Sequence, residues 1–287
     1  MAGVDPVSGS NGATKPLSPS NLALRVLSAV VLAPLALLTA YLGDWPFALF
    51  WGAAALAVLW EWITLVVGST YRLMFSSCGG ALVFSGFLAW LGRPTAALLI
   101  IGLGAMASAI FAPPERRLWV TIGISYAGAL VLAPIFLRAD ETFGLAVIVL
   151  LFAIVWSTDI FGYFAGRAFG GPKLFPAVSP KKTWSGAIAG TVGAMIVALA
   201  VAGWFGLSNK PAILIIALLL SVLAQLGDLF ESWVKRQFGA KDSSQLIPGH
   251  GGVMDRLDGF WAAAVAGCVI GLLRGGFDGP ARGLLLW

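Results

Sequence analysis

The dominant feature of the sequence is a succession of long apolar segments separated by short polar connections. A helix needs about 20 consecutive apolar residues to cross the hydrocarbon core of a bilayer. A window of that length finds nine candidate spans, at residues 23–42, 46–67, 78–92, 95–111, 118–138, 143–165, 184–206, 211–231 and 259–275. The pattern predicts an all-α polytopic integral membrane protein with about nine transmembrane helices.

The composition excludes or disfavours several other classes of protein. Only 11% of the 287 residues are charged, whereas a soluble domain carries about 25% charged residues. The two cysteines lie in apolar segments, which excludes a secreted disulfide scaffold. A single histidine and the lack of a CxxC motif disfavour histidine-ligated zinc sites and serine–histidine triads.

The chain has one expected domain and a polar tail. Residues 1–20 are rich in glycine, serine and proline, which predicts a disordered N-terminal tail. The apolar segment that follows Arg25 is too long for the core of a signal peptide. No linker long enough to separate soluble domains follows, so residues 21–287 are expected to form a single multi-spanning domain.

The distribution of lysine and arginine predicts the orientation in the membrane. With nine spans and a cytoplasmic N-terminus, 13 of the 18 basic residues lie in cytoplasmic connections. Cytoplasmic loops carry an excess of Lys and Arg, so we expect the N-terminus inside and the C-terminus outside. The cytoplasmic face then suits anionic headgroups or phosphates, although such an asymmetry is also the ordinary topology signal of a membrane protein.

Polar residues gather in two cytoplasmic connections, at 166–183 and 231–258, which hold eight of the 18 basic residues and the histidine. Acidic residues lie in or beside the same connections. They are Asp159, Asp228, Glu231, Asp242, Asp255 and Asp258. We therefore expect the functional site at the cytoplasmic face.

The carboxylates indicate a magnesium site more than a zinc site. Asp228 lies in an apolar segment, where an ionised side chain is costly unless it is paired or bound to a metal. Asp255 and Asp258 are three residues apart and would share one face of a helix. Oxygen ligands without a Cys or His cluster suit Mg²⁺. The alternative for Asp255 is a salt bridge to Arg256 or Lys235.

Two lysines directly before the seventh span suggest a phosphate site. Residues 179–183 (SPKKT) place Lys181 and Lys182 beside an expected helix N-terminus, which favours a bound phosphate, and Pro180 is compatible with a helix start. The alternative is that the two lysines only mark the cytoplasmic side.

Two isolated polar residues have a functional and a structural interpretation. His250 lies between glycines, where the backbone can approach a ligand closely, but a single histidine can equally be structural. Glu61 lies within the second span, where a carboxylate is a functional candidate. A hydrogen bond to another helix is the alternative for Glu61.

The second polar connection resembles the signature of phosphatidate cytidylyltransferases, the CDP-diacylglycerol synthases. The family run S-x-x-K-R-x4-K-D-x4-[LI]-P-G-H-G-G-x-x-D-R-x-D is matched by residues 232–258. Further matches are the stretches 224–228 (AQLGD), 156–159 (WSTD) and 179–183, together with Glu61-Trp62. There are two departures: Ser185 stands where an acidic residue is expected, and Gly162 where alanine is more common.

The resemblance implies an enzyme of phospholipid biosynthesis that converts CTP and phosphatidate to CDP-diacylglycerol and pyrophosphate. It implies Mg²⁺ with a second metal or monovalent cation, a homodimer, and a place in the bacterial inner membrane. It assigns the metal to Asp228, Asp255 and Asp258. Lys235, Arg256 and His250 join these aspartates as catalytic candidates. The phosphate-binding candidates are Ser179, Lys181, Lys182, Lys235, Arg236, Lys241 and Arg256. Further candidates are Asp159, Glu231, Asp242 and Glu61.

Other functions fit the sequence less well. A transporter or channel could use Asp159 and Asp228 to carry ions or protons, but its polar groups should lie near the middle of the membrane rather than at one face. The D-G-x2-A-R opening of CDP-alcohol phosphotransferases is not met at residues 278–282, which have one spacer residue too few. Nothing resembles a nucleic-acid-binding module, and we expect no nucleic acid partner.

Overall fold

The computed structural model describes residues 21–68, 72–247 and 251–287. The predicted tail at 1–20 and the candidate residue His250 lie outside this part of the chain. The long helices in it are α1 (Asn21–Leu42), α2 (Asp44–Val66), α3 (Arg72–Trp90), α4 (Pro94–Phe111), α5 (Arg117–Arg138), α6 (Gly144–Phe169), α7 (Trp184–Trp204), α8 (Lys210–Gln237) and α9 (Met254–Gly275). The short elements are the 3₁₀ turn η1 (Pro114–Arg116), strands β1 (Lys173–Phe175) and β2 (Ser179–Thr183), and helix α10 (Pro280–Leu285).

The helical architecture agrees with the hydropathy pattern. Each of the nine predicted spans coincides with one long helix of the described chain. Seven of these helices are long and apolar enough to cross a membrane, and shorter apolar stretches lie in the other two, at Val30–Leu42 and Met74–Trp90. The prediction of an all-α protein with several helices able to span a membrane is confirmed.

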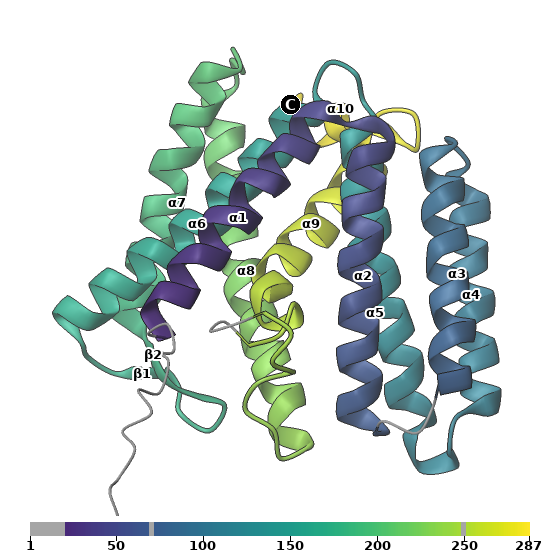
Figure 1. The fold of residues 1–287 in the computed structure, drawn as a ribbon. Helices are drawn as coiled ribbons and strands as arrows, with labels where there is room; N and C mark the ends of the chain where they lie inside the picture. The colour runs from purple at the N-terminus through teal and green to yellow at the C-terminus, as the bar shows by residue number, and fades with distance from the viewer. Residues whose placement is uncertain (1–20, 69–71, 248–250) are drawn as a thin grey trace, which may run out of the picture.

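Successive helices run in alternating directions, so every second connection between helices lies at the same end of the bundle (Figure 1). The β1–β2 hairpin, the end of α8 and the start of α9 lie at one end, at the bottom of Figure 1. Helix α10 and the C-terminus lie at the other. Both polar connections singled out in the sequence therefore reach the same end of the bundle.

Helices α5 and α9 join the two sides of the bundle. Helix α5 packs against α2, α3 and α4 on one side and against α6 and α9 on the other, while α9 also contacts α6, α8 and α10. The apolar segment of α5 is the most enclosed of the seven spans. Most large apolar side chains that remain exposed lie on the outer helices, where a bilayer would cover them.

Helices α6 and α7 approach each other closely because glycines face the contact. A Cβ atom at Gly190 would lie 2.6 Å from the carbonyl oxygen of Thr158, and one at Gly186 would lie 2.7 Å from that of Gly162. Small residues allow such close approach between helices in membranes. This packing places Gly166, near the end of α6, against Thr183 of the strand that carries the two lysines, and brings Asp159, two turns earlier on α6, within electrostatic reach of Lys182.

The prediction that residues 179–183 lie directly before a helix N-terminus is confirmed, but Pro180 itself lies in a strand that the sequence did not predict. Residues 179–183 form β2, which pairs with β1 in an antiparallel hairpin, and α7 begins only at Trp184. Thr183 is the N-cap, and its Oγ1 accepts a hydrogen bond from the Gly186 N–H at 3.2 Å. Proline lacks an N–H but is tolerated at the edge of a sheet, and this sheet has two strands, both of them edges.

Candidate active site

Acidic side chains from three helices lie near one another. Asp159 of α6, Asp228 of α8 and Asp258 of α9 lie within electrostatic reach of one another, and we call them the acidic cluster. Lys182 of β2 lies beside this cluster, with its Nζ 2.5 Å from Asp228 Oδ2. Arg256 lies within electrostatic reach of Asp159. The cluster thus combines carboxylates with cations at the end of the bundle.

A second, more buried group of charges lies between α8 and α9. Lys235 Nζ lies 2.6 Å from Asp255 Oδ1 and 2.6 Å from Glu231 Oε2, and only 8% of the Asp255 side chain is exposed. Glu231 and Lys235 are one helical turn apart on α8. Of the two salt bridges considered for Asp255, the structure contains the one to Lys235. Glu231 lies within electrostatic reach of Asp258, which connects this group to the acidic cluster.

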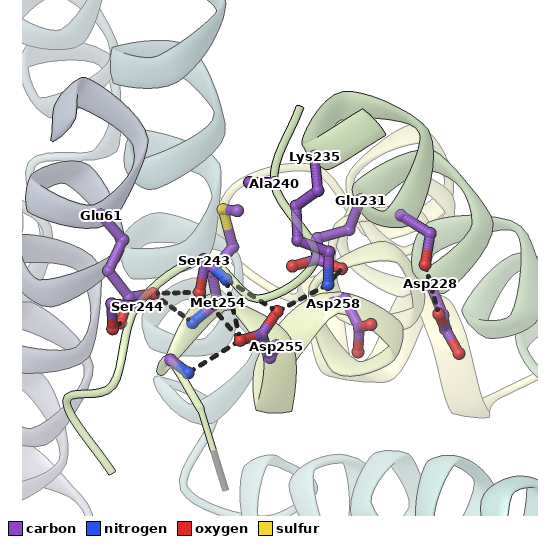
Figure 2. A network of polar contacts seen from close by, with 12 residues as sticks. Glu61, Asp228, Glu231, Lys235, Ala240, Ser243, Ser244, Met254, Asp255 and Asp258 are labelled. Atoms are coloured by element: carbon purple, nitrogen blue, oxygen red, sulfur yellow. Dashed lines mark hydrogen bonds and ion pairs between the residues drawn. The ribbon is translucent and has the colours of Figure 1, made fainter. Parts of the chain in front are cut away.

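Backbone groups of the loop between α8 and α9 also hold Asp255 (Figure 2). Its Oδ2 accepts hydrogen bonds from the Gly252 N–H at 2.7 Å, the Ser243 N–H at 3.1 Å and the Ser243 hydroxyl at 3.0 Å. Its Oδ1 faces the Lys235 ammonium group. Because both oxygens have partners, this carboxylate is held in one orientation.

Glu61 of α2 completes the network from the opposite side (Figure 2). Its carboxylate accepts from the Ser244 hydroxyl at 2.6 Å, the Met254 N–H at 2.7 Å, the Val253 N–H at 2.8 Å and the Ser243 hydroxyl at 3.1 Å. Of the two interpretations drawn from the sequence, a contact with another helix is therefore present. The contact also reaches the loop of the signature run.

The remaining candidates lie nearer the surface. Lys181, Lys241, Arg236 and Asp242 are exposed, and Arg236 donates a hydrogen bond to the Ala240 carbonyl at 3.2 Å. Ser179 is half-buried in β2. The hydroxyl of Ser185 donates to the Gly170 carbonyl and lies 3.1 Å from Thr183 Oγ1. This residue, which departs from the family pattern, therefore connects the C-terminal end of α6 with the N-cap of α7.

Sequence reasoning missed three residues of the network, namely Ser243, Ser244 and Gly252. The two serines occupy unspecified positions of the signature run, directly after Asp242. Gly252 was recognised only as part of the run. A Cβ atom at this position would lie 1.9 Å from Ser243 Oγ and 2.6 Å from Glu61 Oε1, so the network leaves room for glycine alone.

The donor set of the site suits Mg²⁺. All the acidic groups offer oxygen, the ligand atom that Mg²⁺ prefers, and protein sites for this ion often supply only one or two carboxylates beside substrate phosphates. Among the described residues, no group of three or more His, Cys, Asp or Glu side chains is arranged to hold an ion by itself. The acidic cluster therefore fits an ion that is completed by the phosphates of a substrate.

The fold and the site together define a class: a helical protein with several helices long and apolar enough to cross a membrane, and with paired carboxylates and lysines gathered toward one end. Comparison with known families makes this specific. The sequence model of the cytidylyltransferase family matches residues 23–272, so the chain belongs to the cytidylyltransferase family.

Several relatives carry the same name, phosphatidate cytidylyltransferase. The protein of Brucella suis is 46% identical over 267 residues, which cover 91% of this chain and 97% of that protein. The protein of Brucella abortus is 48% identical over 250 residues, 85% of this chain and 91% of that protein. The protein of Haemophilus influenzae is 35% identical over 274 residues, 83% of this chain and 94% of that protein.

Proposed function

We propose that this chain transfers a cytidylyl group from CTP to phosphatidate, giving CDP-diacylglycerol and pyrophosphate. The main support is that the signature run, in its described residues 232–247 and 251–258, contributes Lys235 and Asp255 to a charged group at one end of a bundle of apolar helices. CTP reaches such a site from water, and phosphatidate reaches it by diffusion within the membrane. The relatives that carry this enzyme's name cover nearly the whole chain.

The reaction needs little acid–base chemistry from the protein. A phosphate oxygen of phosphatidate attacks the α-phosphorus of CTP, and the bond from that phosphorus to the pyrophosphate oxygen breaks. Because the second pKa of a phosphate monoester is about 6, the nucleophile is ionised at neutral pH. The protein must instead overcome the repulsion between two anionic substrates and stabilise the charge that grows on pyrophosphate.

The cations of the site are suited to this electrostatic task. Lys182 and Lys235 lie against Asp228 and Asp255, and we propose that their ammonium groups turn to substrate phosphates. Bound Mg²⁺ would neutralise phosphate charge and orient the triphosphate. We propose Asp228, Asp255 and Asp258 as the residues that hold it; Asp255 would have to loosen its contact with Lys235. A second cation and a homodimer are expected only from the resemblance to the family.

The first prediction is the activity itself. Purified protein in detergent is expected to form CDP-diacylglycerol and pyrophosphate from CTP and phosphatidate, and to lose this activity when Mg²⁺ is chelated. Radiolabelled CTP and extraction of the lipid product measure the reaction. If folded protein forms no product with several acyl chains and divalent ions, the proposed reaction is wrong.

The second prediction concerns the orientation of the bundle. We propose that the end with the hairpin and the α8–α9 loop faces the cytoplasm. With Cys78 and Cys268 replaced by alanine, single cysteines at the exposed positions Ala177 and Gln245 should react with an impermeant maleimide only in inverted vesicles. A cysteine at the exposed Glu141, between α5 and α6, should react in intact spheroplasts. Labelling of Ala177→Cys and Gln245→Cys from opposite sides would contradict the proposed site.

A further inference from the structure

Glu61 is the most deeply buried carboxylate of the network. It lies five residues before the end of α2 and is 0% exposed. A buried carboxylate is costly unless hydrogen bonds satisfy it. Its four donors come from a loop and a helix start that lie more than 180 residues further along the chain. Helix α2 is therefore tied to residues 243–244 and 253–254.

Two of these donors belong to the start of α9. The first N–H groups of a helix have no partner within the helix, and a negative charge near them is favourable. Val253, the N-cap residue of α9, has no side-chain oxygen and forms no cap hydrogen bond. Glu61 accepts from the N–H groups of Val253 and Met254 instead. The cap of α9 is thus provided by another helix.

The same carboxylate is connected to Asp255 through one hydroxyl. Ser243 Oγ lies 3.1 Å from Glu61 Oε2 and 3.0 Å from Asp255 Oδ2. Asp255 directly follows Met254, whose N–H Glu61 holds. A displacement of the helix start would therefore move Asp255 relative to Lys235, its partner at 2.6 Å.

We propose that Glu61 is a positioning residue for the cytidylyl transfer: it caps α9 and holds Ser243 and Ser244, so that Asp255 meets Lys235. Glu61 acts through these groups and need not touch the substrate. The inference rests on the proposed function, because Asp255 and Lys235 belong to the proposed site.

The test replaces Glu61 by glutamine. The amide retains one acceptor oxygen but presents an N–H₂ group to donors, so part of the cap and the contact with the loop are lost. Loss of a group that orients a metal or catalytic residue typically lowers activity or metal affinity about 10–100-fold. We expect Glu61→Gln to lower kcat by this factor and to raise the Mg²⁺ concentration that gives half-maximal rate. The wild type, assayed in parallel, tests the proposed function separately.

A matched control lies on the same helix. Asp44, at the other end of α2, accepts a hydrogen bond from the Trp90 indole, far from the network. Asp44→Asn makes the same change of carboxylate to amide and should leave kcat and the Mg²⁺ dependence as in the wild type. All rates are measured per folded molecule, well below the Tm of each variant.

Proteolysis provides a readout that does not depend on catalysis. Lys241 lies in the α8–α9 loop and Lys173 in the hairpin, and both are exposed. If Glu61 fixes the loop, Glu61→Gln should accelerate trypsin cleavage after Lys241 and leave cleavage after Lys173 unchanged. A general loss of stability would accelerate both, and the masses of the fragments distinguish the two sites.

Two further variants decide the question if Glu61→Gln does not fold. Ser244→Ala removes a single donor, and Gly252→Ala pushes a methyl group against the Glu61 carboxylate. Each should show the same combined change in Mg²⁺ dependence and Lys241 cleavage. Gly203→Ala is the control, because a Cβ atom there meets nothing within 4 Å. Wild-type Mg²⁺ dependence and loop cleavage in the folded variants would overturn the proposal.

Discussion

Asp228→Asn is expected to lower turnover about a thousandfold or more with little change in Tm. The amide keeps the shape of the side chain but loses the charge that a bound Mg²⁺ needs, and each ~1.4 kcal/mol of lost transition-state stabilisation is tenfold in rate. The fold should tolerate the change because the Lys182–Asp228 pair is partly exposed, at 25% and 33%. Exposed pairs contribute about 0–1 kcal/mol to stability.

The control for Asp228→Asn lies at the opposite end of the bundle. Asp278 is exposed between α9 and α10, so Asp278→Asn makes the same chemical change away from the site. Turnover of both variants is measured across a range of Mg²⁺ concentrations. If Asp228→Asn keeps the turnover and Mg²⁺ dependence of the wild type, Asp228 does not hold the metal.

Asp255→Asn is expected to lower both turnover and stability. The Asp255 side chain is buried against Lys235 Nζ and accepts N–H groups of the loop, so its charge is compensated within the protein. Loss of such a buried partner costs about 1–3 kcal/mol. Glu231 remains 2.6 Å from Lys235, which keeps that cation paired and favours the lower part of the range.

Thermal unfolding and single-turnover rates separate the two roles of Asp255. A site role predicts that the folded fraction of Asp255→Asn has lost nearly all activity. A purely structural salt bridge predicts a lower Tm and normal turnover of the molecules that remain folded. The second result would remove Asp255 from the proposed metal ligands and leave Asp228 and Asp258 as the candidates.

Hydropathy predicted the helices well because the membrane imposes one length scale on every span. It underestimated two helices of the site. Helix α8 continues to Gln237, beyond the predicted end at residue 231, and α9 begins at Met254, before the predicted start at residue 259. The missing turns are polar, since they carry Lys235, Asp255 and Asp258. The apolar window therefore stops short of these charged turns.

The partners of the charged residues could not be read from the sequence. The chain offers several cations near Asp255, and only the packing of α8 against α9 selects Lys235. Likewise, Glu61 and Ser243 are 182 residues apart, and no local pattern connects them. The hairpin at residues 179–183 was not predicted, because the fixed backbone angle of Pro180 suits the first turn of a helix as well as the edge of a sheet.

The distance along the chain between Glu61 and its donors has a consequence for biogenesis. Chains grow at about 5–20 residues per second, so the 193 residues from Glu61 to Met254 take about 10–40 s to synthesise. During this time α2 must enter the bilayer with a carboxyl group that has none of its final donors. Its position five residues from the end of α2, about 8 Å along the axis, keeps that group within reach of interfacial water. The translocon thus receives a helix whose polar group finds its hydrogen-bond donors only after the start of α9 has been made.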